Sequence, residues 1–198
     1  MQNSPPERAT DPRPARTRAA IVGAVEKLVA DPQGEITVNA VARAAGVSRS
    51  SFYAQFADLD DLAVAMLVDT FRDIGLDDLE GRKAPDADLW TLARASNRRL
   101  VAHIGQRSAF YRASLEWRLS GRVHESVVSA YAQQVLATMA ALGERVPAHV
   151  VHEDAARFVA GGAIALLTGW LRDDAPAGQD AMAERLVAVM PDWLVGTA

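Results

Sequence analysis

Cysteine is absent from all 198 residues of the chain. Its absence excludes disulfide bonds, cysteine zinc sites, iron–sulfur clusters and a thiol nucleophile, and it fits a reducing compartment, for which we expect the cytoplasm. Aromatic residues make up only 6% of the chain, and Ala, Val and Leu supply most of its hydrophobic content. This composition favours helix over sheet, and we therefore expect an all-α protein.

Hydrophobic runs long enough to cross a bilayer are also lacking. The uncharged and mostly apolar stretch Phe158 to Leu171 is too short for that and is interrupted by glycines. Residues 1–15 contain several prolines and no apolar stretch, which is unlike a signal peptide. We expect residues 1–15 to form a flexible arm and the protein to have no membrane partner.

Acidic residues are missing from Ile36 to Ala57, although the whole chain has a net charge of −4. Counted by segment, residues 16–57 carry a net charge of +2 and residues 58–198 a net charge of −6. A surface without carboxylates can approach phosphates without repulsion. The charge distribution therefore predicts a front segment that faces nucleic acid and a separate acidic body.

Apolar residues recur at helical spacing along most of the chain. They predict about nine helices, at approximately Pro14–Ala30, Val38–Ala45, Arg49–Phe56, Leu59–Leu79, Leu89–His103, Arg107–Arg118, Arg122–Leu142, Val150–Leu171 and Gln179–Leu194.

The second and third of these helices have the pattern of a helix-turn-helix. Gly46 stands in the turn, where a positive φ is needed, and Phe52 and Phe56 are spaced to anchor the following helix to the core. At about 100° per residue, the opposite face consists of hydrogen-bonding groups and one cation: Arg49, Ser50, Ser51, Tyr53 and Gln55. Such a face suits a major groove, where Arg49 could donate two hydrogen bonds to a guanine. The alternative is an ordinary amphipathic surface helix, but such helices usually carry Glu and Lys, and this one has neither.

At these residues the chain resembles the tetracycline-repressor (TetR) family of transcription regulators. The resemblance covers about residues 18–65 and includes Thr37-Val38, Ala45-Gly46-Val47-Ser48 and Phe52-Tyr53. It implies a homodimer that binds a palindromic double-stranded DNA operator and a small-molecule effector. Residues 16–57 would form the helix-turn-helix DNA-binding domain, and residues 58–198 the ligand-binding and dimerisation domain.

The resemblance also implies roles for single residues. Base edges would be read by Arg49, Ser50 and Ser51, with Ala54 available for a thymine methyl group. Phosphates would be held mainly by Thr37, Tyr53 and Gln55. The full set of implied DNA-contacting positions is Thr37, Asn39, Ser48, Arg49, Ser50, Ser51, Tyr53, Ala54 and Gln55. Leu59 stands where many members have a Lys that contacts a DNA phosphate. The loss of this contact weakens binding to the DNA backbone unless the N-terminal arm compensates.

The uncharged helix from Phe158 is apolar on nearly all sides, so it must be buried all round. The last predicted helix also has two apolar faces. We expect both helices to pair with their copies in a four-helix dimer interface, the alternative being a monomer in which the uncharged helix is central. The interface residues would be Phe158, Gly161, Gly162, Ala165, Met182, Leu186, Met190 and Trp193.

The middle helices hold most of the aromatic and mixed-polarity side chains. An effector pocket of aromatics with a few polar groups would draw on Phe71, Trp90, His103, Phe110, Tyr111, Ser114, Trp117 and Tyr131. Residue by residue, packing in the core explains them equally well; the pocket is implied by the family resemblance. It would suit an apolar or aromatic ligand.

No catalytic residues, cofactor or metal site are expected. His149, His152 and Glu153 have a spacing that could bind a metal, but a solvated helix start explains them better.

Taken together, the helix-turn-helix and the family resemblance lead us to expect a ligand-responsive regulator, most simply a repressor that its ligand releases from DNA. The alternatives are a regulator without ligand, or a helical carrier or enzyme that keeps the hairpin as scaffold and uses His103, His124 or Glu116.

Overall fold

The computed structural model describes residues 12–29, 36–84, 86–116, 120–173 and 175–196. Within these ranges the chain forms α-helices, one 3-10 helix and no strand, which confirms the all-α prediction. The elements are α1 (Arg13–Val29), α2 (Val38–Ala45), α3 (Arg49–Tyr53), α4 (Leu59–Gly81), α5 (Leu89–Gln106), α6 (Ser108–Leu115), α7 (Ser120–Leu142), η1 (Gly143–Arg145), α8 (His152–Arg172), α9 (Gln179–Ala188) and α10 (Asp192–Val195).

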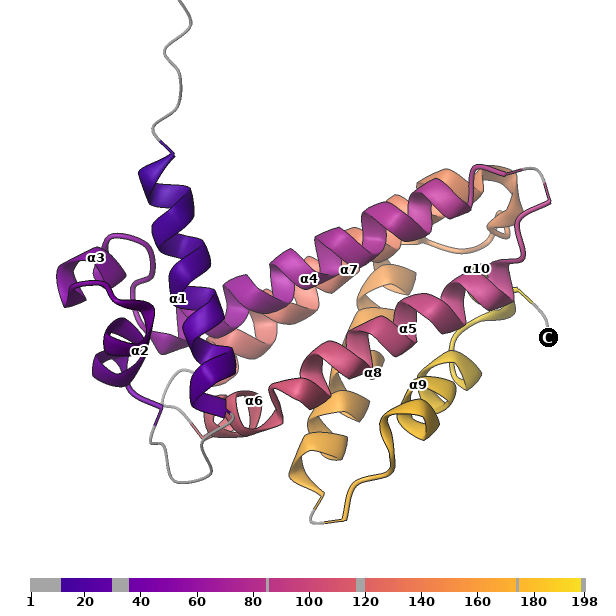
Figure 1. The fold of residues 1–198 in the computed structure, drawn as a ribbon. Coiled ribbons are helices and arrows are strands. Elements are labelled where there is room, and N and C mark those ends of the chain that lie inside the picture. Colours follow the sequence, from indigo (N-terminus) through magenta and orange to yellow (C-terminus); the bar gives the residue numbers. More distant parts are fainter. Residues whose placement is uncertain (1–11, 30–35, 85, 117–119, 174, 197–198) are drawn as a thin grey trace, which may run out of the picture. The chain divides into compact units, whose positions relative to one another are not determined.

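The helices divide into two compact units, Met1–Asp58 and Leu59–Ala198. In the first unit, α1 packs against both α2 and α3 (Figure 1). Its core is formed by fully buried side chains from all three helices and from the turn after α3: Ile21, Val25, Val41, Phe52 and Phe56.

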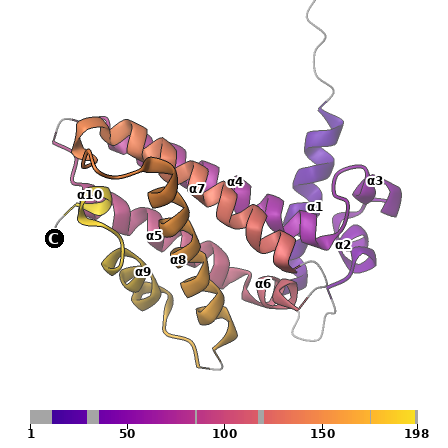
Figure 2. The same cartoon turned by 180° about the vertical axis from the view of Figure 1, so that it is seen from behind.

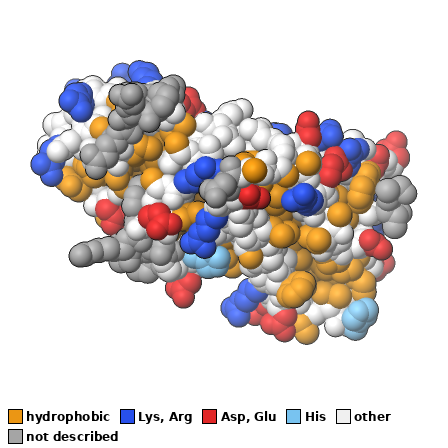
Figure 3. Space-filling view, turned by 90° about the horizontal axis from the view of Figure 1, so that it is seen from below, with side chains coloured by type: hydrophobic (Ala, Val, Ile, Leu, Met, Phe, Trp, Pro, Cys, Tyr) orange, Lys and Arg blue, Asp and Glu red, His pale blue; other side chains and the backbone are white. Residues whose placement is uncertain are grey.

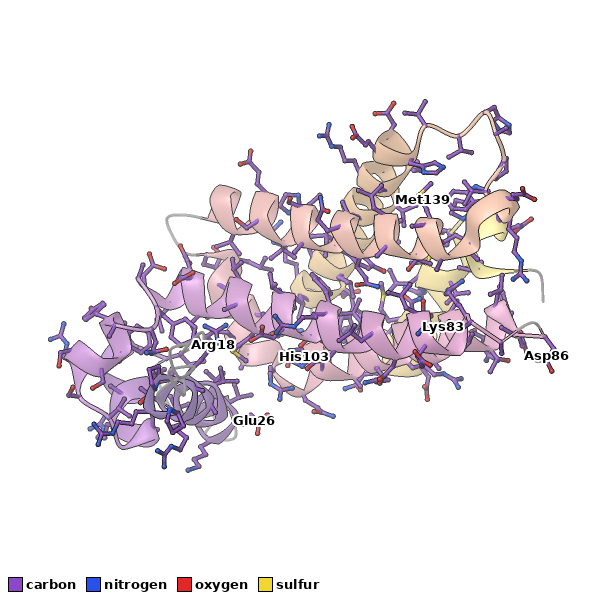
Figure 4. The ribbon with its side chains drawn as sticks, turned by 90° about the horizontal axis from the view of Figure 1, so that it is seen from above. Arg18, Glu26, Lys83, Asp86, His103 and Met139 are labelled. Atoms are coloured by element: carbon purple, nitrogen blue, oxygen red, sulfur yellow. The ribbon has the colours of Figure 1, made fainter. Side chains whose placement is uncertain are left out.

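The second unit is a layered helical bundle. Helices α4 and α7 lie side by side, and α5 packs against α4 on one side and α9 on the other (Figure 1). Helix α8 crosses α7 on the far side of the bundle (Figure 2). Met139 of α7 is fully buried where the two helices meet, in a cluster with Ala156 and Ala160 of α8 (Figure 4). Small residues on α8 thus allow the close crossing.

Several predicted helices end at other residues in the structure; the helix expected over Leu89–His103, for example, continues to Gln106. The helix expected over Arg49–Phe56 stops at Tyr53 and continues as a turn. The helix expected over Gln179–Leu194 is broken into α9 and α10. Pro191 stands between them, and it cannot donate the backbone hydrogen bond that a continuous helix needs.

Among the described residues, no helix combines the length and the hydropathy needed to cross a membrane.

Candidate functional site

The turn between α2 and α3 is fixed by glycine geometry. Gly46 adopts φ +69°, the left-handed region that other residues enter only at a cost. The backbone N–H of Gly46 donates to Arg43 O at 3.1 Å, and that of Val47 donates to Ala42 O at 3.0 Å. This pair of hydrogen bonds is the Schellman arrangement that ends a helix sharply. The turn therefore sets the direction in which α3 leaves α2.

A cluster of three serine hydroxyls marks the start of α3. Ser48 caps the helix, accepting a hydrogen bond from Ser51 N at 3.0 Å. Its Oγ lies 2.8 Å from Oγ of Ser50 and 2.8 Å from Oγ of Ser51. Ser48 and Ser50 are exposed and Ser51 is half-buried. The cluster thus presents exchangeable donors and acceptors at the surface.

The opposite side of α3 is held by two phenylalanines. Phe52 and Phe56 are fully buried, with ring centroids 5.8 Å apart. Phe56 N donates to Phe52 O at 2.9 Å, so the turn after α3 keeps the two rings on one side. The guanidinium of Arg18 lies 4.8 Å from the centre of the Phe56 ring. The predicted burial of both phenylalanines is confirmed, and it orients the rest of α3 outward.

Arg49 and Tyr53 share one edge of the outward face. Cζ of Arg49 lies 5.9 Å from the centre of the Tyr53 ring, and 48% of Tyr53 is exposed. Ala54 is exposed, and Gln55 is half-buried. The face therefore offers a guanidinium, a phenol, an amide and a methyl group within one and a half turns.

Helix α2 contributes its first turn. Thr37 Oγ1 accepts a hydrogen bond from Ala40 N at 3.2 Å, which leaves the hydroxyl hydrogen able to donate outward. Asn39 is exposed. Both residues belong to the stretch that lacks carboxylates, and Lys and Arg side chains stand out at the left end of Figure 3, which the first unit forms. The predicted DNA-contacting residues thus lie on one unit, on α2, α3 and their flanking turns.

The predicted effector residues divide between separate places in the second unit. Phe71 and Tyr131 stack with ring centroids 4.9 Å apart and line one cavity of about 70 Å³. Tyr111 and Ser114 line a second cavity of about 70 Å³. Trp90 packs against the hydrophobic cluster around Met139. The structure therefore does not gather these residues in one pocket.

Three of the predicted effector residues remain. Phe110 is fully buried and lines neither of these cavities. His103 lies between α4 and α5 (Figure 4) and contacts Tyr111 and Thr70. Trp117 lies outside the described residues.

Polar residues that sequence reasoning did not single out line the first cavity. They are Asp78, Arg82, Ser96, Asn97, Gln134 and Thr138. A signal for two of them exists in the sequence, because Asp78 and Arg82 follow Phe71 at spacings that keep them on its face of α4. Burial and then the Asp78 carboxylate raise the pKa of Tyr131 to about 12, so this phenol stays protonated at neutral pH.

Part of the predicted dimer surface is exposed on α8. Phe158 is 80% exposed, and Gly162 and Ala165 are also exposed, so its own chain leaves one face of α8 open, and the predicted burial on all sides would need a second chain. Within the chain, α8 packs mainly against α7 and also touches α6 and α9. Hydrophobic side chains gather over this part of the molecule, at the lower right of Figure 3.

The remaining residues of the predicted interface are less accessible. Met182 and Leu186 are buried within the chain itself, so the prediction that their side chains form an interface is corrected, although Leu186 borders the same apolar hollow as Phe158. Gly161, Met190 and Trp193 are half-buried. The accessible apolar surface is instead extended by Leu166 and Val189.

His149, His152 and Glu153 are all exposed. Among the described residues, no three His, Asp or Glu side chains come close enough to hold a metal ion.

Comparison with known proteins agrees with this geometry. Residues 21–66 match the family model described as bacterial regulatory proteins, tetR family. No curated protein matches the chain. The predicted resemblance to the TetR family is confirmed by that match and by the solved structures of similar fold.

Three of these solved structures illustrate the similarity. The fatty acid degradation regulator FadR from Bacillus halodurans has a TM-score of 0.56 at 16% identity, covering 99% of this chain and 98% of its own. NalD, the secondary repressor of the MexAB-OprM multidrug efflux pump in Pseudomonas aeruginosa, has a TM-score of 0.54 at 22% identity, covering 93% and 99%. The multidrug binding protein EbrR, complexed with imidazole, has a TM-score of 0.52 at 22% identity, covering 94% and 97%. The chain therefore has the fold of TetR-family DNA-binding transcriptional regulators.

Proposed function

We propose that the protein is a homodimeric transcriptional repressor of the cytoplasm, released from a palindromic DNA operator by a small uncharged ligand. The observation that carries the proposal is the outward face of α3. Phe52 and Phe56 are buried behind it, while Arg49 and Tyr53 are exposed in front of it. Arg49 would read a base edge, and Tyr53 and Thr37 would hold phosphates.

Two copies are needed to read a palindrome. A two-fold dimer presents two recognition helices about 34 Å apart, one turn of DNA. The apolar surface of α8 and α9 supports such a dimer, because Phe158, Leu166 and Val189 expose large hydrophobic groups on neighbouring parts of one face. Burying that face against its copy would remove it from water.

The ligand-responsive part of the proposal rests on the second unit. Its cavities contain both apolar and polar groups, as small-molecule sites do. Two proteins of the same fold are described as a secondary repressor and a multidrug binding protein, which supports the same pairing of roles here. The ligand would lower DNA affinity only by the difference between its affinities for the two conformations.

Selection of bound duplexes from a random DNA pool tests the proposal. We expect enrichment of an inverted repeat whose half-sites lie about one helical turn apart. Binding to random duplex should also weaken steeply as salt increases, because bound counterions are released from the phosphates. A chain that enriches no sequence and binds random duplex without salt dependence is not a regulator, and a carrier or enzyme would then explain the second unit better.

A further inference from the structure

A cavity in the second unit is lined by two residues that each carry a buried polar atom without a partner. The cavity has a volume of about 70 Å³ and is lined by residues of α4, α5, α7, α8 and α10 and of the segments beside them. Most of its lining is apolar, including Phe71, Leu100 and Val135. Within the described part of the chain, Asn97 Oδ1 and Gln134 Nε2 are buried and have no hydrogen-bond partner. Leaving such atoms unpaired costs free energy, so each calls for a physical reason.

The orientation of the Asn97 amide is set by its own helix. Nδ2 of Asn97 donates to Ala93 O at 2.9 Å and lies 4.0 Å from the sulfur of Met190. The carbonyl oxygen is therefore the atom left unpaired. Only 5% of Asn97 is exposed, so bulk water does not reach this oxygen. Asn97 thus supplies a buried hydrogen-bond acceptor.

Gln134 enters the cavity from α7 over a glycine of α4. A Cβ atom on Gly75 would lie 1.9 Å from Cδ of Gln134, so the missing side chain at Gly75 makes the room for the amide. The amide nitrogen of Gln134 has no acceptor in the described residues. Gln134 thus supplies a donor to the cavity for which Asn97 supplies an acceptor.

The charges beside the cavity are already compensated. Arg82 Nε donates to Asp78 Oδ2 at 2.6 Å, and Arg82 Nη1 donates to Leu194 O at 3.0 Å. Ser96 Oγ donates to the other carboxylate oxygen of Asp78 at 3.0 Å. A charged ligand would lose its hydration here without finding a free counter-charge. The cavity therefore favours an uncharged molecule.

We propose that this cavity binds an uncharged ligand that carries a neighbouring donor and acceptor, as a carboxamide does, on a small apolar body. The ligand's N–H would donate to Asn97 Oδ1, and its carbonyl would accept from Gln134 Nε2. This inference rests on the ligand-responsive part of the proposed function and names the ligand's chemical class.

The size of the cavity links binding to conformation. A volume of about 70 Å³ is about half that of a cavity of about 150 Å³ that accepts benzene. On the proposed mode of binding, an aromatic amide moves the lining side chains apart. Such a ligand binds a conformation with an expanded cavity more tightly than one with a compact cavity. This difference in affinity is what regulation by a ligand requires.

Four matched probes test the proposal on the full chain: benzamide, benzoate, benzylammonium and toluene. Binding is measured by isothermal titration calorimetry at pH 7.5. We expect benzamide to bind about tenfold or more tightly than each of the others, since only it fills both hydrogen bonds without carrying a charge. The proposal is overturned if benzoate or toluene binds as tightly as benzamide, or if no probe binds. In the second case the cavity would hold only water.

Substitutions then locate the binding. Asn97→Leu and Gln134→Met should each weaken benzamide binding by about twofold to tenfold while toluene binding persists, which shows that the variants remain folded. Gly75→Ala, which displaces the Gln134 amide, should have the same effect as Gln134→Met. Gln106→Met, the same change at an exposed glutamine of α5, should leave both affinities unaltered. Unchanged benzamide affinity in Asn97→Leu and Gln134→Met contradicts the assignment.

DNA binding is measured separately without any probe. If the chain binds its selected duplex but none of the probes, the ligand inference fails and the DNA-binding proposal stands. If the chain binds no DNA, the proposed function fails, and the probe series still reports on the cavity.

Discussion

Nε2 of His103 and the hydroxyl oxygen of Tyr111 lie 2.8 Å apart, joining α5 to α6. Nη1 of Arg107 lies 3.3 Å from Nδ1, the other ring nitrogen of His103. Because a guanidinium can only donate, Nδ1 must be the acceptor of this hydrogen bond. The imidazole is therefore neutral, with its proton on Nε2 and available to Tyr111. Burial and then the Arg107 charge lower the pKa of His103 to about 4. Burial also raises the pKa of Tyr111 well above its ordinary value.

This histidine should make stability depend on pH. The unfolded chain takes up a proton near pH 6.5, while the folded chain resists protonation of His103 down to about pH 4. The unfolded state thus binds more protons in this window, and the free energy of unfolding falls as the pH drops from 6.5 towards 4. The fall is at most about 1.4 kcal/mol per pH unit for one proton, and less here because His103 is partly exposed.

Urea unfolding at pH 7.5 and pH 5 measures the effect. His103→Gln, which keeps a donor for Tyr111, should lose less stability between the two pH values than the parent chain. His149→Gln removes an exposed histidine and should not change the difference. An unaltered pH dependence in His103→Gln would show that other groups cause it.

Arg49 and Tyr53 should contribute differently to DNA binding. Arg49→Ala should erode sequence preference by about 1–3 kcal/mol, because a bidentate contact with a guanine is lost. Tyr53→Ala should weaken binding to all duplexes alike, because a phosphate contact carries no sequence information. Binding of the selected duplex and of random duplex is compared at one salt concentration. Equal losses on both duplexes in Arg49→Ala would remove its base-reading role.

Gly46 and Gly23 allow a matched test of the turn. An added Cβ would meet no atom within 4 Å at either position, but only Gly46 has a positive φ. Gly46→Ala should destabilise the chain by about 1–2 kcal/mol through backbone strain. Gly23→Ala, inside α1, should stabilise it by about 0.5–1 kcal/mol. Thermal unfolding of both variants checks the opposite signs, and a stable Gly46→Ala would show that the turn tolerates another conformation.

The proposed dimer can be broken at Phe158. Each dimer would bury two copies of this ring, so Phe158→Asp should weaken association by about 3 kcal/mol or more. Leu76→Asp introduces the same charge at another exposed hydrophobic residue, on α4, and should leave association unchanged. Analytical ultracentrifugation over a concentration series measures both. A Phe158→Asp variant that associates as strongly as the parent chain would place the interface elsewhere.

The candidate DNA-binding surface was largely predictable because its determinants are local. Ser48 as a cap, Gly46 in the turn and the four-residue spacing of Phe52 and Phe56 act within a few residues of one another. The effector residues were less predictable. Trp90 and Phe110 are aromatic, as residues of a ligand pocket often are, but they pack in or against the hydrophobic core. The sequence could not distinguish the two cases, because it does not reveal which faces of neighbouring helices meet.

The same ambiguity affected the last helices. Met182 and Leu186 lie on an apolar stripe that looks like an interface in the sequence, yet these two side chains are covered within the chain. Asn97 continues the buried stripe of Ala93, Leu100 and Ile104, a signal that sequence reasoning could have used. Its partner in the cavity comes from a different helix, so the pairing itself had no local signal.

The sequence by itself determined the helical class, the turn between α2 and α3 and the polar face of α3, because capping, glycine geometry and helical period act over four or five residues. Tertiary structure alone decided that Asp78, Asn97 and Gln134, carried by three helices, meet around one cavity. It also decided which apolar face of α8 stays exposed. Both outcomes depend on which helices pack together, and packing joins residues that are far apart in the chain.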